Sequence, residues 1–344
     1  MIRRCVISAL ALFAAEAMLS PASSSAQPTA DFFAGKTISI FVATGEGGAY
    51  SLYAQLAAEH MRKHLPGNPT MIVQNLPGAG GIRTADYLQN VAPKDGTAIA
   101  MLLDLVAVTQ MLRPRTVKYD VAKFAVIGSV VTDNPVVMVR ADTGVQSFQD
   151  LKTTQVIAGA SGNGSQTYIH PALMKEVLGA KIKIVTGYRG SSDISLALER
   201  GEVQAQSATW VSWKARHTDW IKDKKIIPVA QVGLKKEPEL PDVPLMSELA
   251  TSDDDRQVLE FMSSGSQVGR FLAAPPGVPA DRIAALRHAF DAMVEDKDFL
   301  QAAAKQKLAV KATPGPEVQA IIQKVVSYSP AIIQRARDAI GAVD

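Results

Sequence analysis

The sequence predicts an α/β protein in which strands and helices alternate along the chain. Short apolar runs recur between longer amphipathic stretches, and small-residue loops join several of these runs to the helix that follows. One unit of apolar strand, small-residue loop and helix occurs twice, in residues 38–64 and 156–178. Such alternation is typical of mostly parallel sheets flanked by helices. A chain of 344 residues is long enough for two domains.

The first third of the chain is expected to contain three strands and two helices. Apolar residues predict strands over residues 38–43, 70–74 and 98–103. Residues 49–64 carry apolar side chains at helical spacing, and the helix ends before the breaker Pro-Gly-Asn-Pro. A second glycine loop opens another helix over residues 83–89.

The rest of the chain repeats this alternation. The strand over residues 156–160 leads into a helix that ends at Gly179, and Pro171 predicts that this helix starts late or is kinked. Ser329 and Pro330 form a good start for the last helix. The other expected elements are strands over residues 136–140, 183–186 and 271–274, a short capped turn over 147–151, and helices over 192–200, 280–294 and 316–326.

Composition narrows the functional classes. Hydrophobic residues make up 47% of the chain and charged residues 20%, as in ordinary folded soluble proteins. The net charge of +3 is spread along the chain without a basic block. A nucleic-acid footprint needs clustered Lys and Arg, so we expect no nucleic-acid partner.

Residues 1–26 are expected to be a secretory signal peptide that is cleaved near Ala26, which places the mature protein in the periplasm. The basic start, the apolar residues 5–20 and the small residues before Ala26 fit this pattern. Glu16 interrupts the apolar stretch and argues against a membrane anchor. The only cysteine, Cys5, lies inside the signal, so the mature chain is expected to have no disulfide and no thiolate metal ligand.

Two glycine-rich loops, each between an apolar strand and a helix, are candidate anion-binding sites. The first contains Gly47 and Gly48, and the second runs over residues 75–81. The N–H groups and the positive dipole at a helix N-terminus favour a carboxylate or a phosphate. A third small-residue loop, residues 161–165, follows another strand, and ligands of open α/β sheets bind at the carboxyl ends of strands.

Known catalytic and nucleotide-binding motifs are incomplete. In the first glycine loop, Tyr50 occupies the place of the third glycine of a dinucleotide fingerprint, and no P-loop string occurs. The stretch around Ser161 ends in Asn163 where a serine nucleophile motif needs Gly. His60 and His64 share a helix face but lack the further ligands of a zinc site. We therefore expect no catalytic residue, no metal and no cofactor.

The segments described above together resemble the solute receptors of tripartite tricarboxylate transporters, the Bug family of periplasmic binding proteins. The resemblance runs from about residue 33 to the C-terminus and rests on the order and spacing of modest motifs. These are Phe33-x-Gly35-Lys36-Thr37-Ile38, Gly47-Gly48-x-x-Ser51-x-x-Ala54, Pro66-Gly67-Asn68-Pro69, Gln74-Asn75-x-Pro77-Gly78-Ala79-Gly80, Ala92-Pro93-Lys94-Asp95-Gly96-Thr97, Gly162-x-Gly164-Ser165, Tyr188-Arg189-Gly190, Arg200-Gly201-Glu202-Val203, Leu240-Pro241-Asp242-Val243-Pro244 and Ala274-Pro275-Pro276-Gly277-Val278-Pro279.

The resemblance implies a type II-like periplasmic binding protein, with two α/β lobes that close over a ligand. Lobe 1 would comprise residues 33–134 and 271–344, and lobe 2 residues 135–270, with a hinge near residues 134–136 and 268–271. It implies no catalysis, a small organic carboxylate as ligand, and delivery of that ligand to the membrane permease subunits; we expect a monomer.

The ligand-binding residues carried over by position are Gly47, Gly48, Ser51, Gly78, Ala79, Gly80, Gly81, Ser161, Gly162, Gly164 and Ser165, with Ala49 and Tyr50 beside them. Ser51 stands where the family usually has Asp, and Gln204 where an acid often occurs, which argues against an amino-acid ligand. Arg83 and Arg189 lie beside the loops and could pair with a second ligand carboxylate. Trp210 is expected to pack in the core, with a ligand-facing indole as the alternative.

Two rival functions remain open from the sequence. A periplasmic sensor subunit would bind the same carboxylate but dock on a signalling partner. An exported α/β enzyme that acts on carboxylates would need a nucleophile–base pair or a metal set, and the sequence shows neither.

Overall fold

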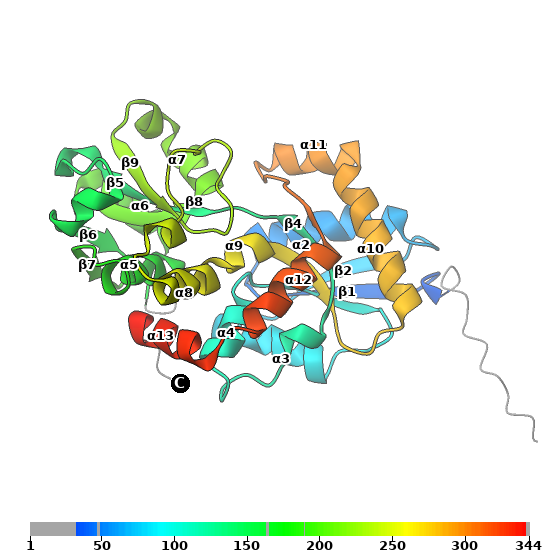
Figure 1. The fold of residues 1–344 in the computed structure, drawn as a ribbon. Coiled ribbons are helices and arrows are strands. Elements are labelled where there is room, and N and C mark those ends of the chain that lie inside the picture. The colour runs from blue at the N-terminus through cyan, green and yellow to red at the C-terminus, as the bar shows by residue number, and fades with distance from the viewer. Residues whose placement is uncertain (1–31, 47–48, 163–164, 189, 342–344) are drawn as a thin grey trace, which may run out of the picture.

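Two separate sheets organise the chain, and each forms a lobe with the helices packed on it (Figure 1). The computed structural model describes residues 32–46, 49–162, 165–188 and 190–341. Strands β1 to β4, β10 and β11 build the first sheet, and strands β5 to β9 build the second. The prediction of a two-lobed α/β fold is therefore confirmed.

The first lobe contains a six-stranded sheet. In spatial order the strands are β11 (Thr313–Pro314), β4 (Ala125–Val131), β10 (Arg270–Ala274), β3 (Ala98–Leu102), β1 (Thr37–Val42) and β2 (Thr70–Asn75). One apolar face packs on α2 (Ala49–Met61), α10 (Ala280–Glu295) and α11 (Lys297–Lys305). The opposite face packs on α3 (Ile82–Asn90), α4 (Val106–Leu112) and α12 (Gly315–Val326).

The second lobe contains a five-stranded sheet. Its order is β7 (Ile182–Val185), β6 (Val156–Gly159), β8 (Ala205–Thr209), β5 (Pro135–Arg140) and β9 (Ile226–Gln231). Helices α6 (Ser191–Arg200) and α7 (Trp210–Lys222) cover one face, and α5 (Gln166–Glu176) covers the other. The chain returns to the first sheet through α8 (Asp253–Ser263) and α9 (Gly265–Val268).

Both sheets are mixed, which corrects the expectation of mostly parallel pairing. Strands within the strand–loop–helix units are parallel, as in β1 with β2 and β3, and β6 with β7 and β8. Antiparallel pairs form where the chain crosses between lobes: β4 leaves the first sheet and β10 returns to it beside β4. The same crossing sets β5 antiparallel to β8 and β9.

Local signals placed most of the expected elements within a few residues. The expected strand over residues 38–43 is β1, and the last helix, α13 (Pro330–Ile340), is capped by the Ser329 hydroxyl. Of the two alternatives expected from Pro171, a late start or a kink, the late start was wrong: α5 begins at Gln166 and continues through the proline. Proline in the second turn removes a single helical donor, and packing on the sheet compensates for that loss.

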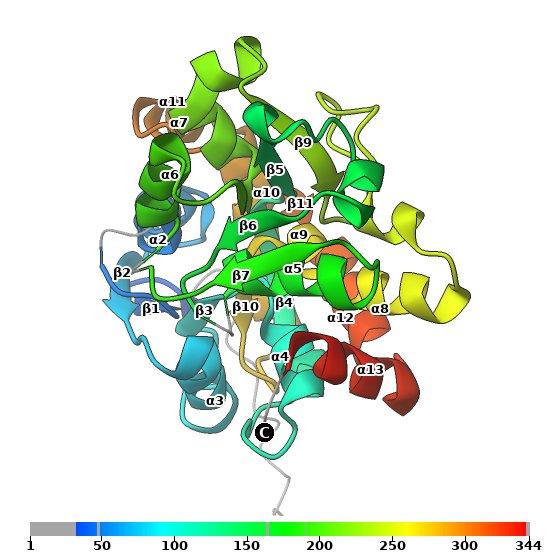
Figure 2. The same cartoon turned by 90° about the vertical axis from the view of Figure 1, so that its left-hand side faces the viewer.

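The C-terminal helix α13 contacts both lobes. It packs on α4 of the first lobe, on α5 of the second and on α8, and Figure 2 shows it beside α4 and α8. One hydrophobic cluster accordingly contains residues of both sheets, such as Ala100 and Ala158. The lobe boundaries expected at residues 134 and 271 stay a prediction, and they assign α13 to one lobe although it touches both.

Gly128 in β4 tests the packing of the first lobe. A Cβ added there would overlap the ring of Phe290, which is fully buried on α10. We expect Gly128→Ala to lower the free energy of unfolding by about 1–3 kcal/mol, as overpacking does in cores. Gly190→Ala is the matched control, because a Cβ there meets open space and the backbone is extended (φ 173°). Equal stability of the two variants in urea titrations would contradict this packing.

Candidate functional site

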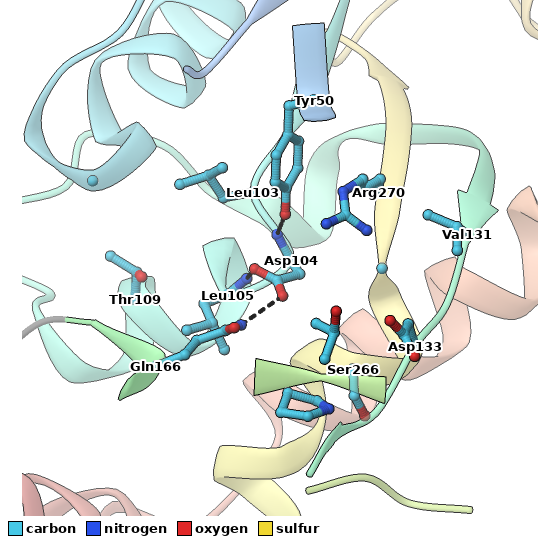
Figure 3. Close-up of a pocket in the computed structure, with 14 residues that line it drawn as sticks. Tyr50, Leu103, Asp104, Leu105, Thr109, Val131, Asp133, Gln166, Ser266 and Arg270 are labelled. Atoms are coloured by element: carbon cyan, nitrogen blue, oxygen red, sulfur yellow. Dashed lines mark hydrogen bonds between the residues drawn. The ribbon is translucent and has the colours of Figure 1, made fainter. Parts of the chain in front are cut away.

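A cavity of about 280 Å³ lies where the chain crosses between the two sheets (Figure 3). We call it the cleft cavity. Its walls come from the start of α2, the second glycine loop, the loop between β3 and α4, both crossing segments, and the starts of α5 and β10. The lining residues are Tyr50, Gly80, Leu103, Asp104, Leu105, Thr109, Val131, Asp133, Pro135, Gln166, Thr209, Ser266, Gly269 and Arg270.

Arg270, the first residue of β10, supplies the positive charge of the cleft cavity. Its guanidinium carbon lies 5.0 Å from the ring centroid of Tyr50 and 5.5 Å from that of Tyr53. Its Nε is buried without a hydrogen-bond partner, and no carboxylate of the described residues lies within ion-pairing distance of it. The two rings therefore hold the guanidinium by cation–π attraction while its N–H groups remain available.

The two tyrosines are themselves fixed. The Tyr53 hydroxyl donates to the carbonyl oxygen of Ala309 at 2.6 Å, and burial raises the pKa of Tyr53 to about 12. Burial, followed by the nearby charge of Asp104, raises the pKa of Tyr50 still further. Both hydroxyls are therefore neutral at physiological pH, and neither competes for Arg270 as an anion.

Gly269 explains how Arg270 reaches the cavity. Its φ of +61° is a conformation that favours glycine, and a Cβ there would overlap the carbonyl oxygen of Val131. Glycine thus lets β10 start in close contact with the end of β4, where Arg270 pairs with Val131. This register places the arginine at the junction of the lobes.

Asp104 connects the two lobes across the cavity. It follows β3, and its carboxylate accepts hydrogen bonds from the Leu105 N–H at 3.0 Å and from Nε2 of Gln166 at 2.9 Å (Figure 3). Gln166 is the first residue of α5 in the second lobe. Burial raises the pKa of Asp104, and the charge of Arg270 opposes that shift.

A second carboxylate, Asp133, lies in the segment that crosses from β4 to β5. It accepts a hydrogen bond from the Val211 N–H at 3.3 Å, and burial raises its pKa against the lowering effect of the Thr209 hydroxyl. Hydroxyls of Thr109, Thr209 and Ser266 complete the polar lining. The cavity thus combines one arginine, two carboxylates with raised pKa values, and neutral polar groups.

The first glycine loop contributes through the start of α2. Gly47 and Gly48 fall outside the described residues, Ala49 opens α2, and Tyr50 lines the cavity. Ser51, in contrast, is fully buried, and its hydroxyl accepts a hydrogen bond from Nδ2 of Asn75 at 3.2 Å.

Asn75 joins the first two loops. Its Nδ2 also donates to the carbonyl oxygen of Thr44 at 2.8 Å, so one side chain at the end of β2 holds both the loop after β1 and the start of α2. Ser51 belongs to this brace, and its contact with a ligand stays a prediction.

The second glycine loop has an unusual backbone. Gly78, Ala79, Gly80 and Gly81 all have positive φ angles, and Ala79 at +47° is the strained member. Gly80 lines the cavity, whereas Arg83 is exposed and lies outside its lining. Such a run of glycines brings the backbone close to a ligand, which side chains would prevent.

The third loop is organised by hydroxyl groups. The Ser165 hydroxyl donates to the carbonyl oxygen of Gly162 at 2.7 Å and lies 2.7 Å from that of Thr167. The Ser161 N–H donates to the same Thr167 hydroxyl at 3.1 Å. Gly164 and Arg189 fall outside the described residues.

Trp210 lies apart from the cleft cavity. It is 5% exposed, belongs to the hydrophobic cluster of the second lobe, and lines a different surface hollow. Its neighbour Trp213 is 1% exposed and donates its indole N–H to the carbonyl oxygen of Val136 at 2.9 Å. Core packing accounts for the indole of Trp213, whereas the buried indole N–H of Trp210 has no hydrogen-bond partner among the described residues, and its contact with a ligand stays a prediction.

The sequence analysis missed three charged residues and one amide of the cavity. Asp104, Asp133, Arg270 and Gln166 were not among the predicted site residues, although each lies at or within two residues of the end of a strand or helix. The signal that could have predicted these residues is a charged or amide side chain next to the end of a buried strand.

Within residues 32–46, 49–162, 165–188 and 190–341, no group of three or more His, Cys, Asp or Glu residues could hold a metal ion. Among the same residues, no helix combines the length and the apolar character needed to cross a membrane.

The raised pKa of Asp104 gives a testable pH dependence. The folded protein keeps this proton to a higher pH than the unfolded chain, so wild-type stability falls as pH rises from about 4 through the folded pKa. Asp104→Asn has no proton to lose, and we expect it to gain stability relative to wild type between about pH 4 and 7. Urea unfolding at several pH values measures the difference.

Asp150→Asn is a control of opposite sign. Backbone N–H groups of Gln146 and Ser147 lower the pKa of Asp150, so its charged form stabilises the fold and that contribution is lost as pH falls. Asp150→Asn should lose stability relative to wild type as pH rises. A pH-independent difference between Asp104→Asn and wild type would contradict the burial of the Asp104 charge.

Comparisons with known proteins agree with this architecture. A UPF0065 protein of Cupriavidus necator is 27% identical over 318 residues, which covers 88% of each chain. The solved structure of a TctC solute-binding protein from Polaromonas has a TM-score of 0.67 at 21% identity, over 87% of this chain and 98% of the other. An R. palustris protein solved with adipate has a TM-score of 0.60 at 19% identity, over 89% and 97% of the two chains.

A family model gives the assignment. The model of the TctC family, described as the tripartite tricarboxylate transporter family receptor, matches residues 53–337, which include strands of both sheets and most of the cavity lining. The predicted resemblance is confirmed, and the chain belongs to the tripartite tricarboxylate transporter receptor family.

Proposed function

We propose that this protein is a periplasmic receptor that captures a small organic carboxylate and delivers it to the permease subunits of a tripartite tricarboxylate-type transporter. It would be exported, with its signal cleaved near Ala26, and would act as a monomer without catalysis. Membership of the receptor family supports the role, and the cleft cavity supports the ligand class. The adipate in the R. palustris protein is consistent with that class.

The observation that carries the proposal is an arginine with free N–H groups in a cavity between two lobes. Arg270 faces a space that Gly80 and the start of α2 also border. A carboxylate matches both a guanidinium and the N–H groups at helix N-termini. Binding by a guanidinium and by backbone N–H groups needs no nucleophile, so the ligand would be captured without chemical change.

The size of the cavity suits a small ligand. At about 280 Å³ it is near the lower end of ligand pockets, and a small organic acid fits such a space. The sequence contains no complete dinucleotide or P-loop motif, which argues separately against a nucleotide.

Ligand binding would favour closure of the lobes. Groups of the first lobe and Gln166 of the second line the same cavity, and the Gln166–Asp104 hydrogen bond already spans it. A ligand that contacts both walls stabilises the arrangement in which the walls are close. The crossing segments near residues 134–136 and 268–271 would act as the hinge.

The rival enzyme function has one concrete candidate. Nδ1 of His170 lies 2.7 Å from the hydroxyl of Ser207, as in a nucleophile–base pair. Both side chains are almost fully buried in the second lobe and lie outside the lining of the cleft cavity, and burial lowers the pKa of His170 to about 3. A pair without access to substrate supports a structural role, so the receptor is preferred. A sensor subunit would bind ligand in the same way and differs only in its docking partner.

A panel of mono-, di- and tricarboxylates, aromatic acids and amino acids tests the ligand class. We expect one acid class to raise the melting temperature of residues 27–344 by several degrees, because a ligand at 100 times its dissociation constant adds about 2.7 kcal/mol. The compound should be recovered unchanged. Turnover of a bound compound, or stabilisation by amino acids alone, would contradict the proposal.

Gln166→Ala tests the contact across the lobes. Loss of the amide removes its hydrogen bond to Asp104, and we expect the affinity for the acid found above to fall about 10-fold, as for a hydrogen bond to a charged group. Gln149→Ala is the control, because Gln149 is exposed in the second lobe and outside the cleft cavity. Equal affinities of the two variants by calorimetry would exclude a role for this contact in closure.

A further inference from the structure

We propose that Arg270 is a second anion-binding point, which holds a ligand carboxylate distal to the glycine loops and makes the receptor selective for dicarboxylates over monocarboxylates of the same length. This inference rests on the proposed function and adds to it the residue that selects the ligand. Arg270 is preferred over Arg83 as the partner of the second carboxylate, and Arg189 lies outside the described residues.

The balance of hydrogen-bond donors and acceptors in the cavity supports this assignment. Each oxygen of Asp104 already accepts one hydrogen bond, from the Leu105 N–H and from the Gln166 amide. Arg270, in contrast, carries five N–H donors, and its buried Nε has no partner. The group that would satisfy the arginine is therefore an acceptor with negative charge.

The arginine is preorganised for such a group. Tyr50 and Tyr53 hold the guanidinium at 5.0 and 5.5 Å from their ring centroids, and Tyr53 is in turn tied to Ala309. Gly269 fixes the start of β10, so the backbone of the arginine is also constrained. Little side-chain freedom remains to be lost on binding, which favours a bidentate pair with a carboxylate.

The two carboxylates of the cavity do not oppose this role strongly. Burial raises the pKa values of Asp104 and Asp133, which lessens their negative charge at a given pH. The oxygens of Asp104 also accept hydrogen bonds from the Leu105 N–H and the Gln166 amide. A ligand ammonium group would instead place a second cation beside Arg270.

Arg83 is less suited to the second carboxylate. Its side chain is exposed on α3, and it does not line the cleft cavity. Exposed ion pairs contribute little because water and salt screen them. Arg270 therefore has the stronger claim to select between ligands that share one carboxylate.

The test compares succinate, glutarate and adipate with their monomethyl esters, by calorimetry on wild type and variants of residues 27–344. We expect wild type to prefer one diacid over its monoester by about 10- to 100-fold, as for a charged bidentate pair. Arg270→Met should remove that preference, because it should weaken diacid binding far more than monoester binding. Arg270→Lys keeps the charge without the planar fork and should retain an intermediate preference.

Two further variants keep the result interpretable. Arg200→Met makes the same chemical change at an exposed position on α6 and should retain the full preference. Retained monoester binding by Arg270→Met shows that the cavity is still folded. A preference that survives in Arg270→Met, or that is lost in Arg83→Met instead, would overturn the proposal.

The failures of the two proposals are distinguishable. Equal affinity of wild type for diacid and monoester would reject Arg270 as the selecting residue while the receptor function stands. A preference for the ω-amino monocarboxylate of the same length would also reject Arg270 as the selecting residue. It would instead indicate an ammonium-binding site at Asp104 and Asp133. Binding of none of these acids, together with no response to the wider panel, would reject the carboxylate receptor itself.

Discussion

The ligand-binding cleft depends on one cation, the guanidinium of Arg270, which neighbouring side chains hold in place. Arg270 stands where β10 returns to the first sheet, and the rings of Tyr50 and Tyr53 fix it without consuming its N–H groups. A partly buried guanidinium without an ion pair is costly unless something compensates for lost hydration. The two aromatic contacts compensate in part, and the remaining deficit becomes binding energy for an anion.

The topology explains why this cation lies between the lobes. The chain leaves the first sheet along β4, builds the second sheet, and returns along β10 beside β4. This crossing makes both sheets mixed and brings the ends of several strands to one place. Asp104 after β3, Asp133 after β4 and Arg270 at the start of β10 meet there, and Gln166 faces them from the second lobe. The charges of the cleft cavity, its position between the lobes and the proposed lobe closure are therefore all consequences of the crossing along β4 and β10.

Local features of the sequence predicted much of the fold but little of this site. Apolar runs and glycine loops placed β1, α2, β2 and α3, because these signals act over a few residues. β8, with the sequence AQSAT, was missed because its small and polar residues have low strand propensity, and its neighbours β5 and β6 hold it in the sheet. Arg270 and Asp104 are 166 positions apart by their numbering, and only the tertiary fold brings them together. Ser51 shows the reverse case, in which a predicted contact residue serves as a brace for two loops.

The most direct test of the account is a crystal structure of residues 27–344 with the acid that gives the largest thermal upshift. We expect the acid to lie in the cleft cavity between the two sheets, with one carboxylate at the glycine loops, the other against the guanidinium of Arg270, and Gln166 still bonded to Asp104. An acid bound elsewhere, for example in the surface hollow beside Trp210, would contradict it. So would an acid in the cavity whose polar groups face the carboxylates while Arg270 stays unpaired.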